Sequence, residues 1–253
     1  MPALKTLFFD IETAPLLAHI WQPDDGYISP DRILHDSFIL CWSGKWAGQK
    51  RIVSGLLTGD EAKSQDDSRI VTDLADLLRE ADIVVGHNLD QFDIPMLNNR
   101  LLALRLEPLG PLRTLDTLTV ARKSFRLASN KLDYLARLLG LGGKLKTGFS
   151  LWRACYLGDE KALAKMVRYN RRDVVLLEQV FDRLKPYAKT LPRLSEAERA
   201  GERACPSCGS YQLIARGFYR TQASTYQKWR CKNCGRYSRA RTAERNRFTV
   251  HPL

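Results

Sequence analysis

Two acidic residues near the end of an apolar segment offer the first chemistry in this sequence. Asp10 and Glu12 stand two residues apart in the run 5–13. Residues i and i+2 of a strand point to the same face, so both carboxylates would project together while Ile11 enters the core. Two such acids are costly to bury unless a cation neutralises them. The pattern therefore predicts a metal-binding pair, and the alternative is a strand end that reaches solvent.

Further acidic residues follow later in the chain. Asp93 stands two residues before Pro95, so it is either a site residue or the N-cap of a helix. Tyr169 and Asp173 stand four residues apart in a long helical stretch, so the phenol and the carboxylate share one face. Arg172 on this stretch is placed to bracket a phosphate-bearing substrate. The alternative for the last group is a solvated helix face with i, i+4 pairing.

The order of these pieces resembles the three motifs of the DEDD exonucleases, which are the proofreading-type 3′→5′ exonucleases of the RNase H-like superfamily. The chain carries Asp-x-Glu, then Asn-x-x-x-Phe-Asp, then Tyr-x-x-x-Asp within residues 4–184. Residues 116–122 and 130–135 resemble the proofreading domains of family B polymerases. One branch of the family has a histidine where this chain has Arg168, whereas Tyr169 matches the other branch, DEDDy.

The resemblance implies a two-metal phosphodiesterase that removes nucleoside monophosphates from the 3′ end of nucleic acid. Four carboxylates would hold two Mg²⁺ or Mn²⁺ ions, which prefer oxygen ligands: Asp10, Glu12, Asp93 and Asp173. Tyr169 would orient the attacking water, and Asp10 would be the bridging ligand. Asn88, Phe92 and Arg172 would contact the nucleic acid.

Four cysteines near the C-terminal end form two C-x-x-C pairs separated by 22 residues: Cys205, Cys208, Cys231 and Cys234. A glycine follows each pair and eases the tight turn. Four thiolates at this spacing predict one closed structural Zn²⁺ site. A redox dithiol is the alternative, although one pair would suffice for it. Cys41 and Cys155 lack ligands at metal-binding spacing and are interpreted as buried or idle thiols.

Aromatic and basic residues interleave around the second cysteine pair, as on surfaces that stack bases and neutralise phosphates. This part of the chain resembles the zinc ribbons of transposase-associated and other DNA-binding proteins. We expect five nucleic-acid contacts here: Tyr226, Lys228, Trp229, Arg230 and Arg236. The alternative is that the aromatic residues only cover the small core of the ribbon.

Charge and composition agree with a nucleic-acid partner. The 253 residues carry a formal net charge of +12, and residues 196–253 hold 12 Lys and Arg against 4 Asp and Glu. Such an excess attracts polyanions, although a basic solubilising surface is the alternative. No apolar run is long enough to span a bilayer, and the acids at the start argue against a signal peptide. Because the cysteines do not form a disulfide pattern, we expect a cytoplasmic protein, in the nucleoid or in a host cytoplasm if viral.

Hydrophobic periodicity predicts a mixed-sheet α/β domain. The resemblance implies that this domain is RNase H-like, with a mixed sheet flanked by helices. Strands are expected at residues 5–13, 37–45, 50–54, 83–85 and 112–118. Helices are expected near residues 71–78, 94–104, 131–139 and 160–184. The predicted domains are 1–185 for the exonuclease, 186–204 for a linker, and 205–253 for the zinc ribbon with its basic tail.

Two other functions remain open at this stage. One is a nucleic-acid-binding protein that keeps the fold without turnover. The other is a ribonuclease or structure-specific nuclease that uses the same site. Single-stranded DNA is the expected substrate and RNA the alternative. Nothing in the sequence decides between them, because that choice often depends on one contact to the 2′-hydroxyl. Proofreading in trans for a separate replication or repair polymerase is compatible with the chain length.

Overall fold

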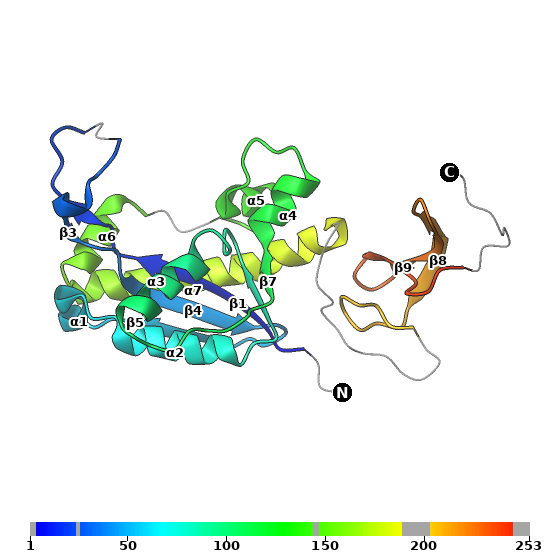
Figure 1. The fold of residues 1–253 in the computed structure, drawn as a ribbon, viewed down its shortest axis with the longest axis horizontal. Coiled ribbons are helices and arrows are strands. Elements are labelled where there is room, and N and C mark those ends of the chain that lie inside the picture. Colours follow the sequence, from blue (N-terminus) through cyan, green and yellow to red (C-terminus); the bar gives the residue numbers. More distant parts are fainter. Residues whose placement is uncertain (1–3, 24–25, 144–146, 189–202, 245–253) are drawn as a thin grey trace. The chain divides into compact units, whose positions relative to one another are not determined.

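The computed structural model describes residues 4–23, 26–143, 147–188 and 203–244 (Figure 1). They divide into two compact units: a large one, Lys5–Phe181, and a smaller one that holds the C-x-x-C cysteines. Residues 189–202 of the expected linker and residues 245–253 of the expected basic tail lie outside the described residues.

The large unit is built on a mixed sheet with the strand order β5-β4-β1-β6-β7. The strands are β1 (Thr6–Thr13), β4 (Ile39–Trp46), β5 (Ile52–Leu56), β6 (Ile83–Gly86) and β7 (Thr114–Asp116). β1 pairs antiparallel with β4 and parallel with β6. The antiparallel strands come first in the chain and the parallel ones follow, which confirms the expected mixed-sheet α/β class.

Helices cover both faces of this sheet (Figure 1). They are α1 (Gly59–Ser64), α2 (Ser68–Arg79), α3 (Asp93–Ala103), α4 (Thr117–Ser124), α5 (Leu132–Leu138), α6 (Phe149–Tyr156) and α7 (Glu160–Leu184). On one face, Trp42 Nε1 of β4 donates a 2.7 Å hydrogen bond to the carbonyl of Ile70 in α2. On the other, Phe8 of β1 meets Phe181 of α7 edge to face, with ring centres 5.5 Å apart.

The alternation of β1 sets which side chains face which helix. Leu7, Phe9 and Ile11 are buried in the main hydrophobic core with α2 and α3. Asp10 and Glu12 share the face of Phe8 and are thus on the α7 side of the sheet.

A hairpin between β1 and β4 was not expected from the sequence. It consists of β2 (Leu17–Ala18), the 3₁₀ turn η1 (Pro30–Arg32) and β3 (Ile33–His35). A second 3₁₀ turn, η2 (Lys185–Tyr187), follows α7. None of the helices in the described part of the chain is both long and apolar enough to cross a membrane.

The small unit is a three-stranded antiparallel sheet with the order β10-β9-β8. Its strands are β8 (Leu213–Arg220), β9 (Thr225–Cys231) and β10 (Tyr237–Arg239). β9 is central, so its alternating side chains define the two faces of this sheet.

Candidate functional site

Three of the predicted acidic residues come together at the contact between β1 and α7. Each of Asp10, Glu12 and Asp173 offers a carboxylate oxygen, and these oxygens all lie within 4.8 Å of one another. β1 contributes the first two because they share a face, and α7 brings Asp173 against that face. Oxygen donors this close together suit a hard divalent cation, which would offset their mutual repulsion.

Asn170 joins this cluster and was missed at the level of the sequence. Its side chain is fully buried, and its Nδ2 donates a 2.8 Å hydrogen bond to Oδ2 of Asp10. Its Oδ1 is buried and has no hydrogen-bond partner among the described residues. Asn170 and Asp173 stand three positions apart in α7 and so share a helix face. This spacing is the feature of the sequence from which Asn170 could have been predicted as a site residue.

Asp93 adjoins the cluster without belonging to the group of three. It is the first residue of α3, it is 2% exposed, and its Oδ1 accepts a 3.3 Å hydrogen bond from the backbone N–H of Ile11. Burial raises the pKa of the Asp93 carboxyl well above its ordinary value, and the charge of Asp10 raises it further. Because it accepts this hydrogen bond, the Asp93 side chain links α3 to the segment between the two acids of β1. The N-cap position of α3 is occupied by Phe92 rather than by Asp93.

Tyr169 lies on α7 beside Asn170 and is 7% exposed. The ring of Trp152 in α6 contacts it edge to face, with the two ring centres 6.0 Å apart. Arg172 is half-buried, and its Nη2 lies 3.5 Å from the carbonyl oxygen of Leu141. Tyr169 is thus held by an aromatic contact, and Arg172 by the loop after α5.

The predicted substrate contacts of the second motif lie between β6 and α3. Asn88 has a left-handed backbone (φ 73°), and its N–H donates a 3.0 Å hydrogen bond to Oδ1 of Asp116. Asn88 lines a cavity of about 630 Å³ whose other lining residues include the cations Arg122 and Lys131. Phe92 is 41% exposed. Two cations in a cavity are suited to a phosphate-bearing ligand, and the acid Asp133 also lines this one.

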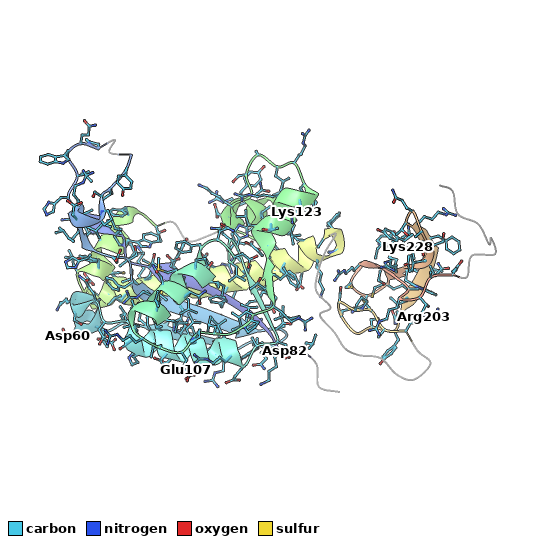
Figure 2. All side chains as sticks on the ribbon, viewed as in Figure 1. Asp60, Asp82, Glu107, Lys123, Arg203 and Lys228 are labelled. Carbon is cyan, nitrogen blue, oxygen red and sulfur yellow. The ribbon has the colours of Figure 1, made fainter. Side chains whose placement is uncertain are left out.

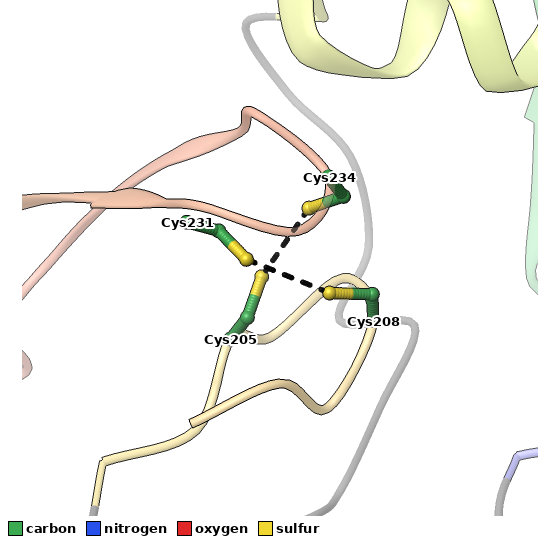
Figure 3. Close-up of side chains that lie close together, drawn as sticks. All are labelled: Cys205, Cys208, Cys231 and Cys234. Atoms are coloured by element: carbon green, nitrogen blue, oxygen red, sulfur yellow. Dashed lines mark hydrogen bonds between the residues drawn. The ribbon is translucent and has the colours of Figure 1, made fainter. Parts of the chain in front are cut away.

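The four cysteines of the small unit converge (Figure 3). Their sulfur atoms all lie within 4.8 Å of one another, with 3.6 Å between Cys205 and Cys234 and between Cys208 and Cys231. A zinc ion with bonds of about 2.3 Å in a tetrahedron would place its sulfur ligands about 3.8 Å apart. The four thiols therefore fit a structural zinc site.

The two C-x-x-C turns repeat one backbone pattern. The N–H groups of Gly209 and Gly235 donate to the carbonyls of Cys205 and Cys231, and both glycines have a positive φ, of 72° and 73°. Only glycine adopts this conformation without strain. Burial raises the pKa of the Cys231 thiol, but hydrogen bonds from the backbone of Cys234 and neighbouring groups outweigh it, so that the pKa falls to about 7. Burial raises the pKa of the Cys205 and Cys234 thiols instead, so a bound metal ion would have to displace their protons.

The expected nucleic-acid contacts of the small unit do not share one surface. Tyr226, Lys228 and Arg230 alternate along one face of β9 (Lys228 is labelled in Figure 2), and Trp229 lies on the opposite face. Arg236 follows the second cysteine pair, and its Nη1 donates a 2.6 Å hydrogen bond to Oγ of Ser207. Arg236 therefore braces the two cysteine turns against each other.

The sheet order and the flanking helices define an RNase H-like fold. A family model described as the RNase H superfamily matches residues 43–185, which is more than half of the chain. The chain belongs to the RNase H superfamily. The match contains Asp93, Tyr169 and Asp173, whereas Asp10 and Glu12 precede it.

A solved structure agrees with this fold. It is the family B DNA polymerase from the hyperthermophilic archaeon Pyrobaculum calidifontis, with a TM-score of 0.52 and 22% sequence identity. The similarity covers 73% of this chain and 25% of the polymerase, so the chain spans about a quarter of that protein's length. No curated protein matches the sequence.

Proposed function

We propose that this protein is a metal-dependent 3′→5′ exonuclease of the DEDDy type. The observation that carries the proposal is the group Asp10, Glu12 and Asp173 on an RNase H-like sheet, with Tyr169 on the same helix as Asp173. Membership of the RNase H superfamily supports a nuclease, and the polymerase with a similar fold supports a nucleic-acid substrate.

The residues of the proposed site divide between three tasks. Asp10, Glu12, Asp173 and the adjoining Asp93 would hold Mg²⁺ or Mn²⁺ ions. Bound divalent cations neutralise the phosphodiester and lower the pKa of water, which supplies the nucleophile. The amide of Asn170 fixes the orientation of the Asp10 carboxylate. Because a phenol is a poor base at neutral pH, Tyr169 would hold the attacking water in line rather than take its proton.

The small unit would serve the same reaction through binding. A zinc ion held by the four cysteines would keep this unit folded and take no part in the chemistry. Its basic sheet would bind nucleic acid, with single-stranded DNA as the proposed substrate and RNA as the alternative. The same proposal includes proofreading in trans for a separate replication or repair polymerase.

The test uses single-stranded DNA and RNA labelled at the 5′ end, with Mg²⁺, with Mn²⁺ and with neither. We expect a metal-dependent ladder that shortens from the 3′ end, and its loss in Asp10→Ala. The matched control is Asp73→Ala, which removes an exposed carboxylate of α2 and should leave the ladder unchanged. Binding without cleavage of either polymer would overturn the enzyme and favour a nucleic-acid-binding protein. Cuts at internal sites would favour a structure-specific nuclease.

A further inference from the structure

One face of the small sheet gathers aromatic and basic side chains, and we refer to it as the Tyr–Arg face. Its members are Tyr219 on β8, Tyr226, Lys228 and Arg230 on β9, and Tyr237 and Arg239 on β10. The strand register places Tyr219 opposite Tyr226, Arg239 opposite Lys228, and Tyr237 opposite Arg230. Directly paired residues project to the same side of a sheet, so these six side chains share one surface.

This face complements a polyanion. It carries three cations and three tyrosines, and none of the strands β8, β9 and β10 contains an aspartate or a glutamate. Tyr219 is 49% exposed and Tyr237 is 50% exposed. Its rings and cations are thus accessible to a ligand that offers both phosphates and flat apolar surfaces.

Arg239 has a particular place on the Tyr–Arg face. Its guanidinium carbon lies 4.0 Å from the centre of the Tyr226 ring and 5.8 Å from the centre of the Tyr219 ring. At 4.0 Å the guanidinium covers one side of Tyr226, and the residue itself is exposed. A guanidinium that is already held against a ring is available to stack on a second flat group at little further cost in side-chain entropy.

We propose that the Tyr–Arg face binds single-stranded nucleic acid and that a nucleobase stacks on the outer side of the Arg239 guanidinium, with Tyr226 beneath it. Lys228 and Arg230 neutralise the neighbouring phosphates. A single strand is the form that fits, because its bases present free π-faces whereas those of a duplex are already stacked. The inference rests on the proposed function for the identity of the ligand, and it adds which face of the small sheet binds and the stacking of a base on Arg239.

The test measures binding rather than cleavage. The full chain with Asp10→Ala is titrated, without added Mg²⁺ or Mn²⁺, into a fluorescent single-stranded 12-mer and into the matching duplex. Arg239→Lys keeps the charge but removes the flat guanidinium, and we expect it to weaken single-strand binding roughly fivefold or more while changing duplex binding little.

The matched control is Arg203→Lys. Arg203 also lies over an aromatic ring, that of Trp229 at 4.8 Å, but Trp229 is on the opposite face of β9. We expect this variant to bind the single strand as the parent does, and both variants to keep the parent's zinc content. Equal effects of the two substitutions would overturn the proposal, and so would an equal loss of single-strand and duplex binding in Arg239→Lys.

Failure of this inference is distinguishable from failure of the proposed exonuclease. Suppose that the unsubstituted protein, which keeps Asp10, cleaves nothing, and that Arg239→Lys still weakens single-strand binding. This result would support the Tyr–Arg face and contradict the enzyme. A metal-dependent ladder together with unchanged binding in Arg239→Lys would support the enzyme and contradict the face.

Discussion

The contact between Asn170 and Asp10 makes the metal affinity of the site depend on an uncharged residue. Asn170→Leu keeps a similar volume but removes the amide that donates to Asp10. We expect Mn²⁺ binding to weaken by about tenfold, as for other groups that orient metal ligands. The melting temperature of the metal-free protein should change little, because loss of the hydrogen bond to Asp10 is offset by removal of a buried oxygen that has no partner among the described residues.

Mn²⁺ titration followed by electron paramagnetic resonance checks this effect without any turnover. The control is Asn98→Leu on an exposed position of α3, which should bind Mn²⁺ as the parent does. Unchanged Mn²⁺ affinity in Asn170→Leu would show that the amide does not orient the carboxylate.

The Tyr169 hydroxyl should matter to catalysis and little to stability. Tyr169→Phe keeps the ring and hence its edge-to-face contact with Trp152. If the hydroxyl positions the attacking water, kcat should fall on the order of a hundredfold while KM changes little. Steady-state kinetics on a single-stranded substrate measure both, and a thermal melt serves as the folding control. A rise in KM at constant kcat would instead assign the hydroxyl to substrate binding.

Spacing in the sequence predicted the acidic cluster better than its surroundings. The i, i+2 relation of Asp10 and Glu12 on a strand defines a shared face, and these two residues come together with Asp173. The spacing of Asn170 from Asp173 is a weaker signal, because an asparagine in a helix is common and its role depends on which strand the helix contacts. The expected contacts of the small unit lie on two faces, with Trp229 opposite Tyr226, because both residues belong to one strand, β9. No strand was predicted at these residues from the sequence.

At the scale of elements, long periodic segments were predicted well, whereas several short ones were missed, although the short elements β6 and α5 lie where they were expected. The helix expected at residues 160–184 is α7 with the same bounds, because its apolar positions repeat over many turns. The strand expected at residues 112–118 is only Thr114–Asp116. The side chain of Asp116 accepts a 2.8 Å hydrogen bond from the N–H of Leu118 and caps α4, which outweighs the β-propensity of the threonines that follow. α6 and the hairpin of β2 and β3 have too few residues for a periodic signal.

The start of α1 should lose stability in acid. The side chain of Arg69 makes two hydrogen bonds to Glu61, of 2.8 Å and 2.7 Å, and they are the largest cause that lowers the pKa of Glu61 to about 2. A carboxyl whose pKa is lower in the folded state stabilises the protein above its unfolded pKa of about 4.5 and loses that contribution as the pH falls toward about 2. Arg69→Gln should therefore lower the melting temperature at pH 6 and have a smaller effect at pH 3.5.

Thermal melts of the parent and Arg69→Gln at both pH values check this sign. Arg79→Gln is the control, since Arg79 pairs with Asp76, a residue whose side chain is 68% exposed. Exposed ion pairs contribute little to stability. An Arg69→Gln effect that grows toward pH 3.5 would contradict the pairing with Glu61.

At the scale of the whole molecule, the proposed function places chemistry and affinity in different units. The acidic cluster and the hydrophobic core around Phe9 belong to the large unit, whereas the cysteines and the Tyr–Arg face belong to the small one. Residues 196–253 carry 12 Lys and Arg against 4 Asp and Glu. Phosphate neutralisation by such a unit releases counterions, so its contribution to binding should fall steeply as salt rises.

Cys231→Ser separates the two roles. Loss of one of four thiolates should abolish stoichiometric zinc and unfold the small sheet, because binding of a structural metal supplies folding free energy. The large unit keeps its own sheet and core, so kcat on a dinucleotide, which offers very few phosphates to the basic sheet, should stay within about twofold of the parent. KM for a long single strand should rise about tenfold or more at low salt, and the difference should shrink as added salt screens the parent's basic sheet.

Zinc content and the two kinetic constants, measured over a salt series on both substrates, test this prediction. A fall in kcat on the dinucleotide as large as that on the long strand would mean that the small unit is needed for the chemistry itself.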